Sequence, residues 1–307
     1  MLIYHSNDFI LPLPKEHRFP MDKYRLLKEN VEKYLTQPYF HHQILQAPTL
    51  SDEQIKRVHD HAYVDGIIQG SLALPQLRRI GFPWSTQMVE RCRRSSGATL
   101  AAAESALKYG RGVNLAGGTH HAYRAQGGGY CVFNDSAIAV KNLEYAGKIR
   151  RSLIVDLDVH QGDGTAEILG NDPQHFCFSM HGENNYPFHK MKSDLDIPLP
   201  DGCGDELYLS LLDQHLSDCF EKSKPDLVIY IAGADPYQGD QLGKLKLTQV
   251  GLAQRDQMVF ECADRYGTPV AMSMGGGYAK NIQEIANIHC NSVLIAAGEM
   301  PILDSIL

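Results

Sequence analysis

The sequence predicts a single α/β domain, residues 1–307, in which helices cover both faces of a central parallel β-sheet. Three observations support this fold class. Short runs rich in Val, Ile and Leu alternate with stretches of helical periodicity, as in a buried parallel sheet. Of the 307 residues, 43% are hydrophobic, so one large core can form. Neither a repeat nor a low-complexity linker divides the chain.

The predicted helices have apolar residues spaced three to four positions apart. Residues 21–35 and 51–69 show this spacing, and the second stretch opens with Ser51, a favourable N-cap. A long helix is predicted from about residue 85 to residue 108, ending at Gly110. The remaining helices are predicted at residues 134–147, 205–222, 248–266 and 279–289.

The strand candidates are short apolar runs, and in chain order they are 112–116, 151–159, 176–180, 226–232 and 269–274. The second run ends in alternating residues, so Asp156, Asp158 and His160 are predicted to share one face of a strand. Residues 181–204 contain three prolines and three glycines and are predicted to be irregular. A loop of that length is either functional or a solvated excursion, and the sequence leaves both open.

The composition argues against several classes of protein. A net charge of −7 disfavours binding to nucleic acid, which usually requires a basic surface. Seven scattered cysteines without a CxxC motif predict free thiols in a reducing compartment. No stretch approaches 18 uninterrupted apolar residues, and the N-terminus lacks a signal-peptide pattern. We therefore expect a cytoplasmic protein without a membrane span.

Residues with catalytic chemistry follow four of the predicted strands. Because ligands of a parallel α/β sheet bind outside the carboxyl ends of its strands, these residues are expected to meet in one crevice. In chain order the four segments carry His120 with His121, Asp158 with His160, Asp235, and Tyr278. Each motif alone is a weak indication, since paired histidines usually decorate a surface and DxH has many structural uses. Their joint occurrence favours a metal site.

The predicted ligands of that site are Asp158, His160 and Asp235. Three protein ligands leave coordination positions open for water and substrate, which is the catalytic pattern. Zn²⁺ suits this set, and Fe²⁺ suits it as well. Such an ion polarises a carbonyl and a water, while the Tyr278 hydroxyl can stabilise an oxyanion. The paired histidines have the pKa for proton transfer, and Asp156 and Asp163 are the nearby acids that would orient them.

At this point the sequence resembles the histone deacetylase family, zinc-dependent amidohydrolases with an arginase-like α/β fold. The resemblance is carried by the segments "GGTHHAYRAQGGGYCVFND", "IVDLDVHQGDGT", "VIYIAGADPYQGDQLGKLKLT" and "GGGYAK". It extends from residue 17 to the last helix. The Gln after the ligand histidine in "DVHQG" and the segment "AGADPYQGDQLGKLKLTQVGLAQRDQMVF" are most similar to the class IV branch.

The resemblance implies a role for each candidate residue. Zinc ligands are implied at Asp158, His160 and Asp235. His121, backed by Asp163, corresponds to the general base and acid, and His120, backed by Asp156, adds electrostatic support. Tyr278 matches the tyrosine that polarises the scissile carbonyl. A structural K⁺ beneath the site is also implied, with ligands from the Asp156 carboxylate, the backbone at Asp158 and His160, and Ser179.

The resemblance further implies a channel for the acyl-lysine side chain. Gly129 and Tyr130 match the glycine–aromatic pair that lines it, with the glycine carbonyl holding the substrate N–H. The second aromatic wall would fall within residues 181–189, where Tyr186 or Phe188 could serve or the channel could be open. An open wall would favour long acyl chains, so acetyl and fatty-acyl groups both remain possible.

The predicted function is hydrolysis of an Nε-acyl amide on a lysine of a protein or peptide, or on a small amine. An acetylpolyamine hydrolase is the main alternative and needs acidic residues at the pocket mouth, for which Glu183 and Asp194 are the candidates. A ureohydrolase with two Mn²⁺ needs a second DxD, which "GADPYQGD" does not supply. A catalytically silent scaffold would have lost one of the site residues, and all are present. The sequence does not give the oligomeric state.

Overall fold

Eight parallel strands form the centre of the computed structural model, which describes residues 1–14, 16–35 and 42–302. Every neighbouring pair in this sheet is parallel. Across the sheet the order is β2 (Gln43–Gln46), β1 (Leu2–His5), β3 (Arg111–Asn114), β8 (Val270–Met274), β7 (Leu227–Ala232), β4 (Ser152–Asp156), β5 (His175–Gly182) and β6 (Leu195–Leu199).

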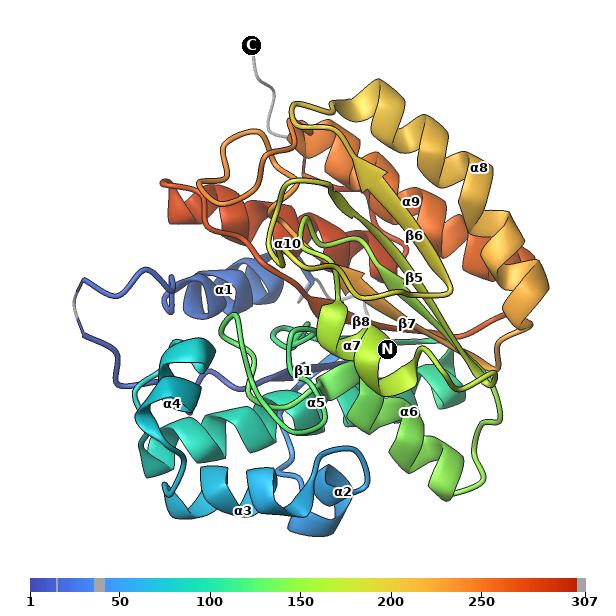
Figure 1. The fold of residues 1–307 in the computed structure, drawn as a ribbon. Coiled ribbons are helices and arrows are strands. Elements are labelled where there is room, and N and C mark those ends of the chain that lie inside the picture. Colours follow the sequence, from blue (N-terminus) through green and yellow to red (C-terminus); the bar gives the residue numbers. More distant parts are fainter. Residues whose placement is uncertain (15, 36–41, 303–307) are drawn as a thin grey trace.

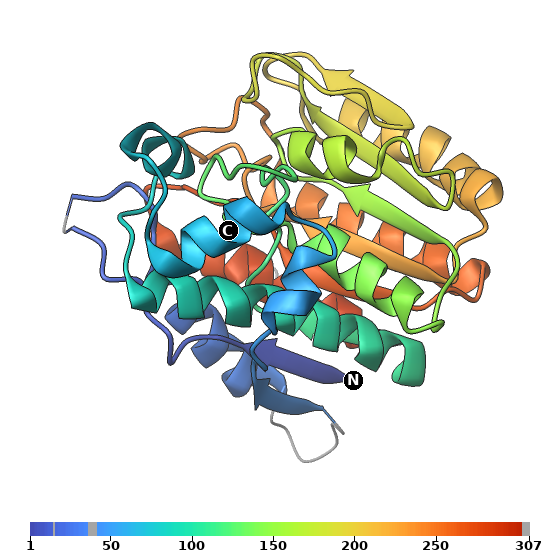
Figure 2. The ribbon, with the colours of Figure 1, turned by 60° about the horizontal axis from the view of Figure 1, so that its bottom comes forward.

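Helices cover both faces of the sheet (Figures 1 and 2). One face packs against α1 (Lys23–Leu35), α8 (Asp205–Ser223), α9 (Gln249–Arg265) and α10 (Ile282–Ala296). The other face packs against α5 (Thr86–Tyr109), α6 (Asp135–Tyr145) and α7 (Asp163–Leu169), with α2 (Asp52–Lys56), α3 (His61–Gln69) and α4 (Leu74–Ile80) beyond α5. The predicted fold class is confirmed.

The strand residues divide between the two cores as their pleat requires. Leu153 and Val155 of β4 belong to the core under α8 and α9, whereas Ile154 belongs to the core under α5 and α6. All three are almost completely buried, which explains why the strand is a continuous apolar run. The seven cysteines are free thiols, and none of the described helices is long and apolar enough to cross a membrane.

Several elements differ from the sequence predictions. The helix predicted at 51–69 is two helices, α2 and α3, because Asp60 occupies the N-cap position of a new helix. The irregular segment predicted at 181–204 contains β6, an edge strand that tolerates Pro198 because one of its sides has no partner strand. The short elements β1, β2, α4 and α7 were not predicted, and the last helix runs to Ala296 rather than 289.

The strand predicted at 151–159 ends at Asp156 instead, so its last residues do not alternate across a strand. Beyond Asp156, side-chain carboxylates accept hydrogen bonds from the backbone N–H groups. The N–H of Asp158 donates to Oδ1 of Asp156 at 3.2 Å, and that of His160 donates to Oδ1 of Asp158 at 2.9 Å. Asp235 Oδ1 accepts from the N–H of Val159 at 2.9 Å. Side chains that bond local backbone in this way replace the ladder of the sheet.

Candidate metal centre and acyl channel

Four neighbouring strands deliver the predicted site residues to one edge of the sheet. Their order is β3, β8, β7 and β4, and all are parallel, so the four loops that follow them meet at the carboxyl edge. In chain order these loops carry His120 with His121 after β3, Asp158 with His160 after β4, Asp235 after β7, and Tyr278 after β8. The predicted convergence is therefore what the structure shows.

Asp158, His160 and Asp235 each offer a ligand atom, and these atoms all lie within 4.8 Å of one another. Nδ1 of His160 is 3.0 Å from Oδ1 of Asp158 and 3.2 Å from Oδ2 of Asp235. Oδ2 of Asp235 is buried and accepts no hydrogen bond from any described residue. A Cβ added at Gly276 would lie 1.8 Å from that oxygen, so the glycine leaves the space beside it open.

The negative charges of the Asp158 and Asp235 carboxylates favour the binding of a cation between them. Burial and the neighbouring Asp158 carboxylate raise the pKa of Asp235 to about 7. Two buried carboxylates directed at one point repel each other, and an ion between them relieves that repulsion. Two carboxylates and an imidazole are ligands that Zn²⁺ accepts. The residues present therefore fit a divalent metal.

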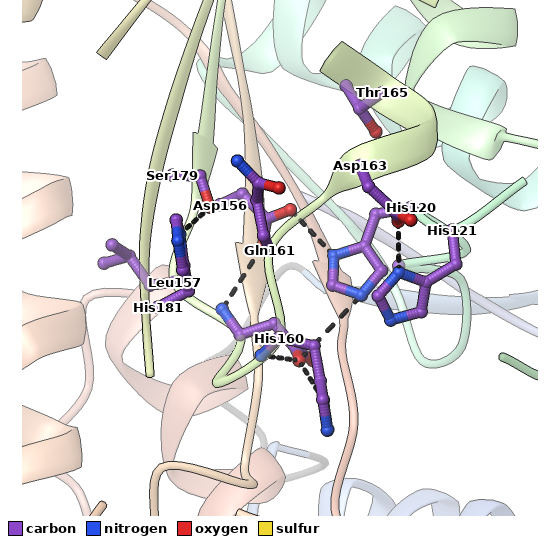
Figure 3. A network of polar contacts seen from close by, with 12 residues as sticks. His120, His121, Asp156, Leu157, His160, Gln161, Asp163, Thr165, Ser179 and His181 are labelled. Atoms are coloured by element: carbon purple, nitrogen blue, oxygen red, sulfur yellow. Dashed lines mark hydrogen bonds and ion pairs between the residues drawn. The ribbon is translucent and has the colours of Figure 1, made fainter. Parts of the chain in front are cut away.

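Two histidine–aspartate pairs stand next to the ligand cluster (Figure 3). Nδ1 of His120 lies 2.7 Å from Oδ2 of Asp156, and Nδ1 of His121 lies 2.5 Å from Oδ1 of Asp163. The Tyr123 hydroxyl donates to the other Asp163 oxygen at 2.9 Å. Both predicted pairings are present, and each leaves Nε2 of its histidine as the nitrogen available for other contacts.

The two histidines have opposite pKa shifts. Burial alone lowers the pKa of His120, but the Asp156 and Asp158 carboxylates outweigh burial and raise it to about 9. Burial, together with the charge of the adjacent His120, lowers the pKa of His121 to about 4. At neutral pH this favours a protonated His120 and a neutral His121. Only a neutral imidazole can accept a proton, so His121 is the one suited to act as a base.

Asp240 fixes the loop that carries Tyr278. Its Oδ2 accepts from the backbone N–H of Tyr278 at 2.6 Å, and its Oδ1 accepts from the N–H groups of Leu242 and Gly243, both at 2.8 Å. The Tyr278 side chain lines the cavity above the metal cluster. Asp240 lies in the segment "GADPYQGD", and this role of its side chain was not predicted.

A cavity of about 490 Å³ leads from the surface to the candidate metal ligands Asp158 and His160. Gly129 and Tyr130 line it, as predicted, and both have positive φ angles, 53° and 65°. Tyr186 lines the cavity as well, and its ring stands edge-on to His121 with centroids 4.8 Å apart. Phe188 is 84% exposed and does not line the cavity. The channel therefore has a second aromatic wall, and the open-wall alternative is wrong.

Two side chains, Gln161 and Lys190, anchor the segment that carries Tyr186 through partly buried hydrogen bonds. Nε2 of Gln161 donates to the Met191 carbonyl at 2.6 Å, and its Oε1 accepts from the N–H of Met191 at 2.9 Å. Nζ of Lys190 donates to the carbonyls of Asn185 and Pro187 at 2.7 and 2.6 Å. The Gln that follows the ligand histidine thus ties the metal loop to the channel wall.

Phe19 and Lys23 also line the cavity and were not predicted. The Phe19 ring lies 5.3 Å from that of Tyr130 and 6.5 Å from that of Tyr278. Nζ of Lys23 is 5.4 Å from the Tyr278 ring, and the side chain is only 2% exposed. Both residues come from the segment before and at the start of α1, which holds no catalytic motif to draw attention to it.

The acids invoked for a polyamine hydrolase do not lie at the mouth. Neither Glu183 nor Asp194 lines the cavity. Oδ2 of Asp194 instead accepts from the backbone N–H of Cys177 at 2.8 Å. That candidate basis for binding a polycation is wrong.

Among the described residues one further cluster could hold a metal, formed by Glu144, Asp172 and His175. It lies at the start of β5, away from the carboxyl edge. Nζ of Lys141 lies 2.7 Å from Glu144 and 2.6 Å from Asp172, so a side-chain cation already neutralises these acids.

The fully buried Arg255 holds both metal loops from below. Its Nη1 donates to the carbonyl of Gly233 at 2.6 Å and to that of Leu157 at 3.2 Å. These residues stand beside the ligands of the β7 and β4 loops. The guanidinium also pairs with the buried Asp256 at 2.8 Å.

Arg255→Met is expected to lower the free energy of unfolding by about 3–5 kcal/mol, because it leaves the buried Asp256 carboxylate unpaired. Zinc affinity should fall as well, since the carbonyls beside both ligand loops lose their donor. Urea unfolding and a zinc titration measure the two effects. Arg25→Met is the control, because Arg25 pairs only on the exposed surface of α1. Equal stability losses in the two variants would contradict the role of Arg255.

The fold and the site together define an arginase-like α/β hydrolase. The model of the histone deacetylase domain matches residues 17–293. The chain belongs to the histone deacetylase family. Membership supports deacetylase-type amide hydrolysis.

Individual relatives agree with this assignment. An uncharacterized protein of Picosynechococcus sp. is 47% identical over 94% of this chain and 95% of its own length. Histone deacetylase 2 and histone deacetylase 6 of Arabidopsis thaliana are 35% and 30% identical over 62% and 84% of this chain. The matches span only 50% and 58% of those two plant proteins.

Solved structures show the same fold. A histone deacetylase homologue from Aquifex aeolicus has a TM-score of 0.79 at 23% identity, covering 97% of this chain and 84% of its own. The HDA15 HD domain has a TM-score of 0.82 at 21% identity, covering 97% and 91%.

Proposed function

We propose that this protein hydrolyses Nε-acyl-lysine amides with Zn²⁺ held by Asp158, His160 and Asp235. One observation carries the proposal. The three ligand atoms, both histidine–aspartate pairs and Tyr278 gather at the inner end of one aromatic-walled channel. A channel of this kind admits a linear side chain and presents its terminal amide to the catalytic groups.

The ion would supply Lewis-acid chemistry, polarising the amide carbonyl and a water. The neutral His121 takes a proton from the attacking water as the new C–O bond forms. It then gives that proton to the amine nitrogen as the C–N bond breaks, so the products are a carboxylate and a free amine. His120, charged beside Asp156, favours the negative charge that develops. The Tyr278 hydroxyl donates to the carbonyl oxygen in the transition state.

The channel walls would hold the methylene stem of the acylated lysine. Tyr130 and Tyr186 both line this channel, and the carbonyl of Gly129 would accept the substrate N–H. Acetyl and longer acyl groups are both candidates. A series of peptides with acetyl, butyryl, octanoyl or myristoyl on one lysine tests the proposal. Activity rising with chain length would indicate a fatty deacylase, activity confined to acetyl would indicate a deacetylase, and no activity on any peptide would refute the proposal.

Further parts of the assignment remain our proposals. Residues 1–307 would act as one catalytic domain of the class IV type, in the cytoplasm, and Fe²⁺ is a second possible occupant of the metal site. A structural K⁺ with ligands from Asp156, the backbone at Asp158 and His160, and Ser179 is likewise a proposal. Asp156 and Ser179 are paired in register on adjacent strands, but the Ser179 hydroxyl already lies 3.0 Å from Nδ1 of His181.

Tyr186→Gly is expected to lower kcat/KM for an acetyl-lysine peptide by about tenfold, because its ring would bury methylene groups of the lysine stem, each worth about 0.8 kcal/mol. Zinc content should not change, since Tyr186 is no ligand. Steady-state kinetics and metal analysis provide the measurement. Phe188→Ala is the matched control and should leave kcat/KM unaltered. A Tyr186 variant as active as the parent would show that the second wall is elsewhere.

A further inference from the structure

Two arginines stand at the mouth of the channel. Arg78 and Arg79 lie in the last turn of α4, line the cavity and are exposed to solvent. The end of α4 is fastened to the channel itself. The carbonyl of Arg79 accepts from the N–H of Gly129 at 3.2 Å, and that of Ile80 accepts from the N–H of Tyr130 at 2.8 Å. The helix end therefore has a fixed place beside the wall residues.

Arg79 and Tyr186 both lie beside Gly128. A Cβ built on Gly128 would have the Tyr186 hydroxyl at 3.4 Å and Cγ of Arg79 at 3.6 Å. The two side chains thus border the same short backbone segment. Nη1 of Arg79 donates to the side-chain carbonyl of Gln126, which is neutral. Because this partner is uncharged, the positive charge of the Arg79 guanidinium is not neutralised at the mouth of the channel.

The charges lining the cavity are unbalanced. Apart from the histidines of the candidate metal centre, the cationic lining side chains are Lys23, Arg78 and Arg79. The only carboxylate among the described lining residues is Asp158, a candidate metal ligand. Lys23 is buried at depth, so the two arginines carry the charge of the mouth. Across the described part of the chain, no carboxylate forms an ion pair with Arg78 or Arg79. This local excess of positive charge occurs in a protein with a net charge of −7.

We propose that Arg78 and Arg79 form an anion-binding rim that selects acyl-lysine substrates with Asp or Glu next to the modified lysine. The inference rests on the proposed function and names its substrate class. Guanidinium groups bind carboxylates through paired N–H donors, and at an exposed rim such pairs act mainly on association and specificity. The same charges repel a polycationic substrate, so histone-tail-like peptides and polyamines are disfavoured.

The test uses three peptides with one acetyl-lysine flanked by Glu, Gln or Lys, and zinc-loaded protein. KM should rise in that order, with about a tenfold span at low salt, as expected for a few exposed charge pairs. The span should shrink in about 0.5 M salt, because exposed pairs are screened. In the Arg78→Gln/Arg79→Gln double variant the span should fall to within about twofold.

Arg150 and Arg151 provide the matched control, because they are adjacent exposed arginines before β4, at the amino edge of the sheet. Their double change to Gln should keep the wild-type span. Equal KM values for the three peptides would overturn the proposal that Arg78 and Arg79 form an anion-binding rim. An equal loss of the KM difference in both double variants would overturn it as well. If no peptide is cleaved, the proposed function fails, and fluorescence anisotropy of the same peptides still tests the rim. Tighter binding of the Glu peptide, lost only in the Arg78/Arg79 variant, supports it, and equal binding refutes it.

Discussion

Tyr278→Phe is expected to lower the rate of acyl-lysine hydrolysis by a factor of about 10² or more, the usual loss for one oxyanion donor. The change removes only a hydroxyl. The ring remains to pack near Phe19 and Tyr130, 6.5 and 6.2 Å away between centroids. The backbone N–H of residue 278 still donates to Asp240. Fold and zinc content should therefore persist while transition-state stabilisation is lost.

The measurement is kcat on an acetyl-lysine peptide, with zinc per chain and the melting temperature determined on the same sample. Tyr109→Phe is the control, because this tyrosine is 51% exposed at the end of α5, outside the cavity lining. An unchanged kcat in Tyr278→Phe would remove Tyr278 from the mechanism. A parallel loss of zinc would show that the residue acts through the metal site instead.

Asp235→Ala is expected to abolish activity through loss of the metal. It removes one of the three proposed ligands and also the acceptor for the N–H of Val159, which lies between the other two. Changes to groups that merely orient ligands cost about 10- to 100-fold in metal affinity, so loss of a ligand should exceed about 100-fold.

Zinc analysis after dialysis against a weak chelator provides the measurement. Asp172→Ala is the matched control, since that acid belongs to the cluster neutralised by Lys141 and should leave zinc at one per chain. Stoichiometric zinc retained in Asp235→Ala would show that the third ligand is another residue.

The sequence was sufficient to bring the candidate residues together because each lies after an apolar strand. His121 and Tyr278 are far apart in the chain, but their strands, β3 and β8, are neighbours in the sheet. Strand alternation was the wrong reason for placing Asp156, Asp158 and His160 together, because the strand ends at Asp156. They lie close together because carboxylates, rather than a partner strand, hold the backbone there.

The groups that position the site were harder to predict, because their contacts are distant in sequence. Arg255 reaches Leu157 across 98 residues, and Gln161 reaches Met191 across 30. Neither contact produces a motif among residues that are close together in the sequence. Tyr186 sits in a segment with mixed turn residues, where only the three-dimensional path shows which aromatic ring enters the channel.

Zinc-dependent release of acetate from an Nε-acetyl-lysine peptide tests the central claim most directly. Protein stripped by a chelator would receive increasing Zn²⁺, and mass spectrometry would follow the deacetylated peptide. We predict negligible release without metal and a linear rise in rate that reaches its plateau at one zinc per chain, with a plateau lower by a factor of about 10² or more in Tyr278→Phe. Full activity in the stripped protein, or no release at one zinc per chain with any of the four acyl groups, would contradict the proposed mechanism.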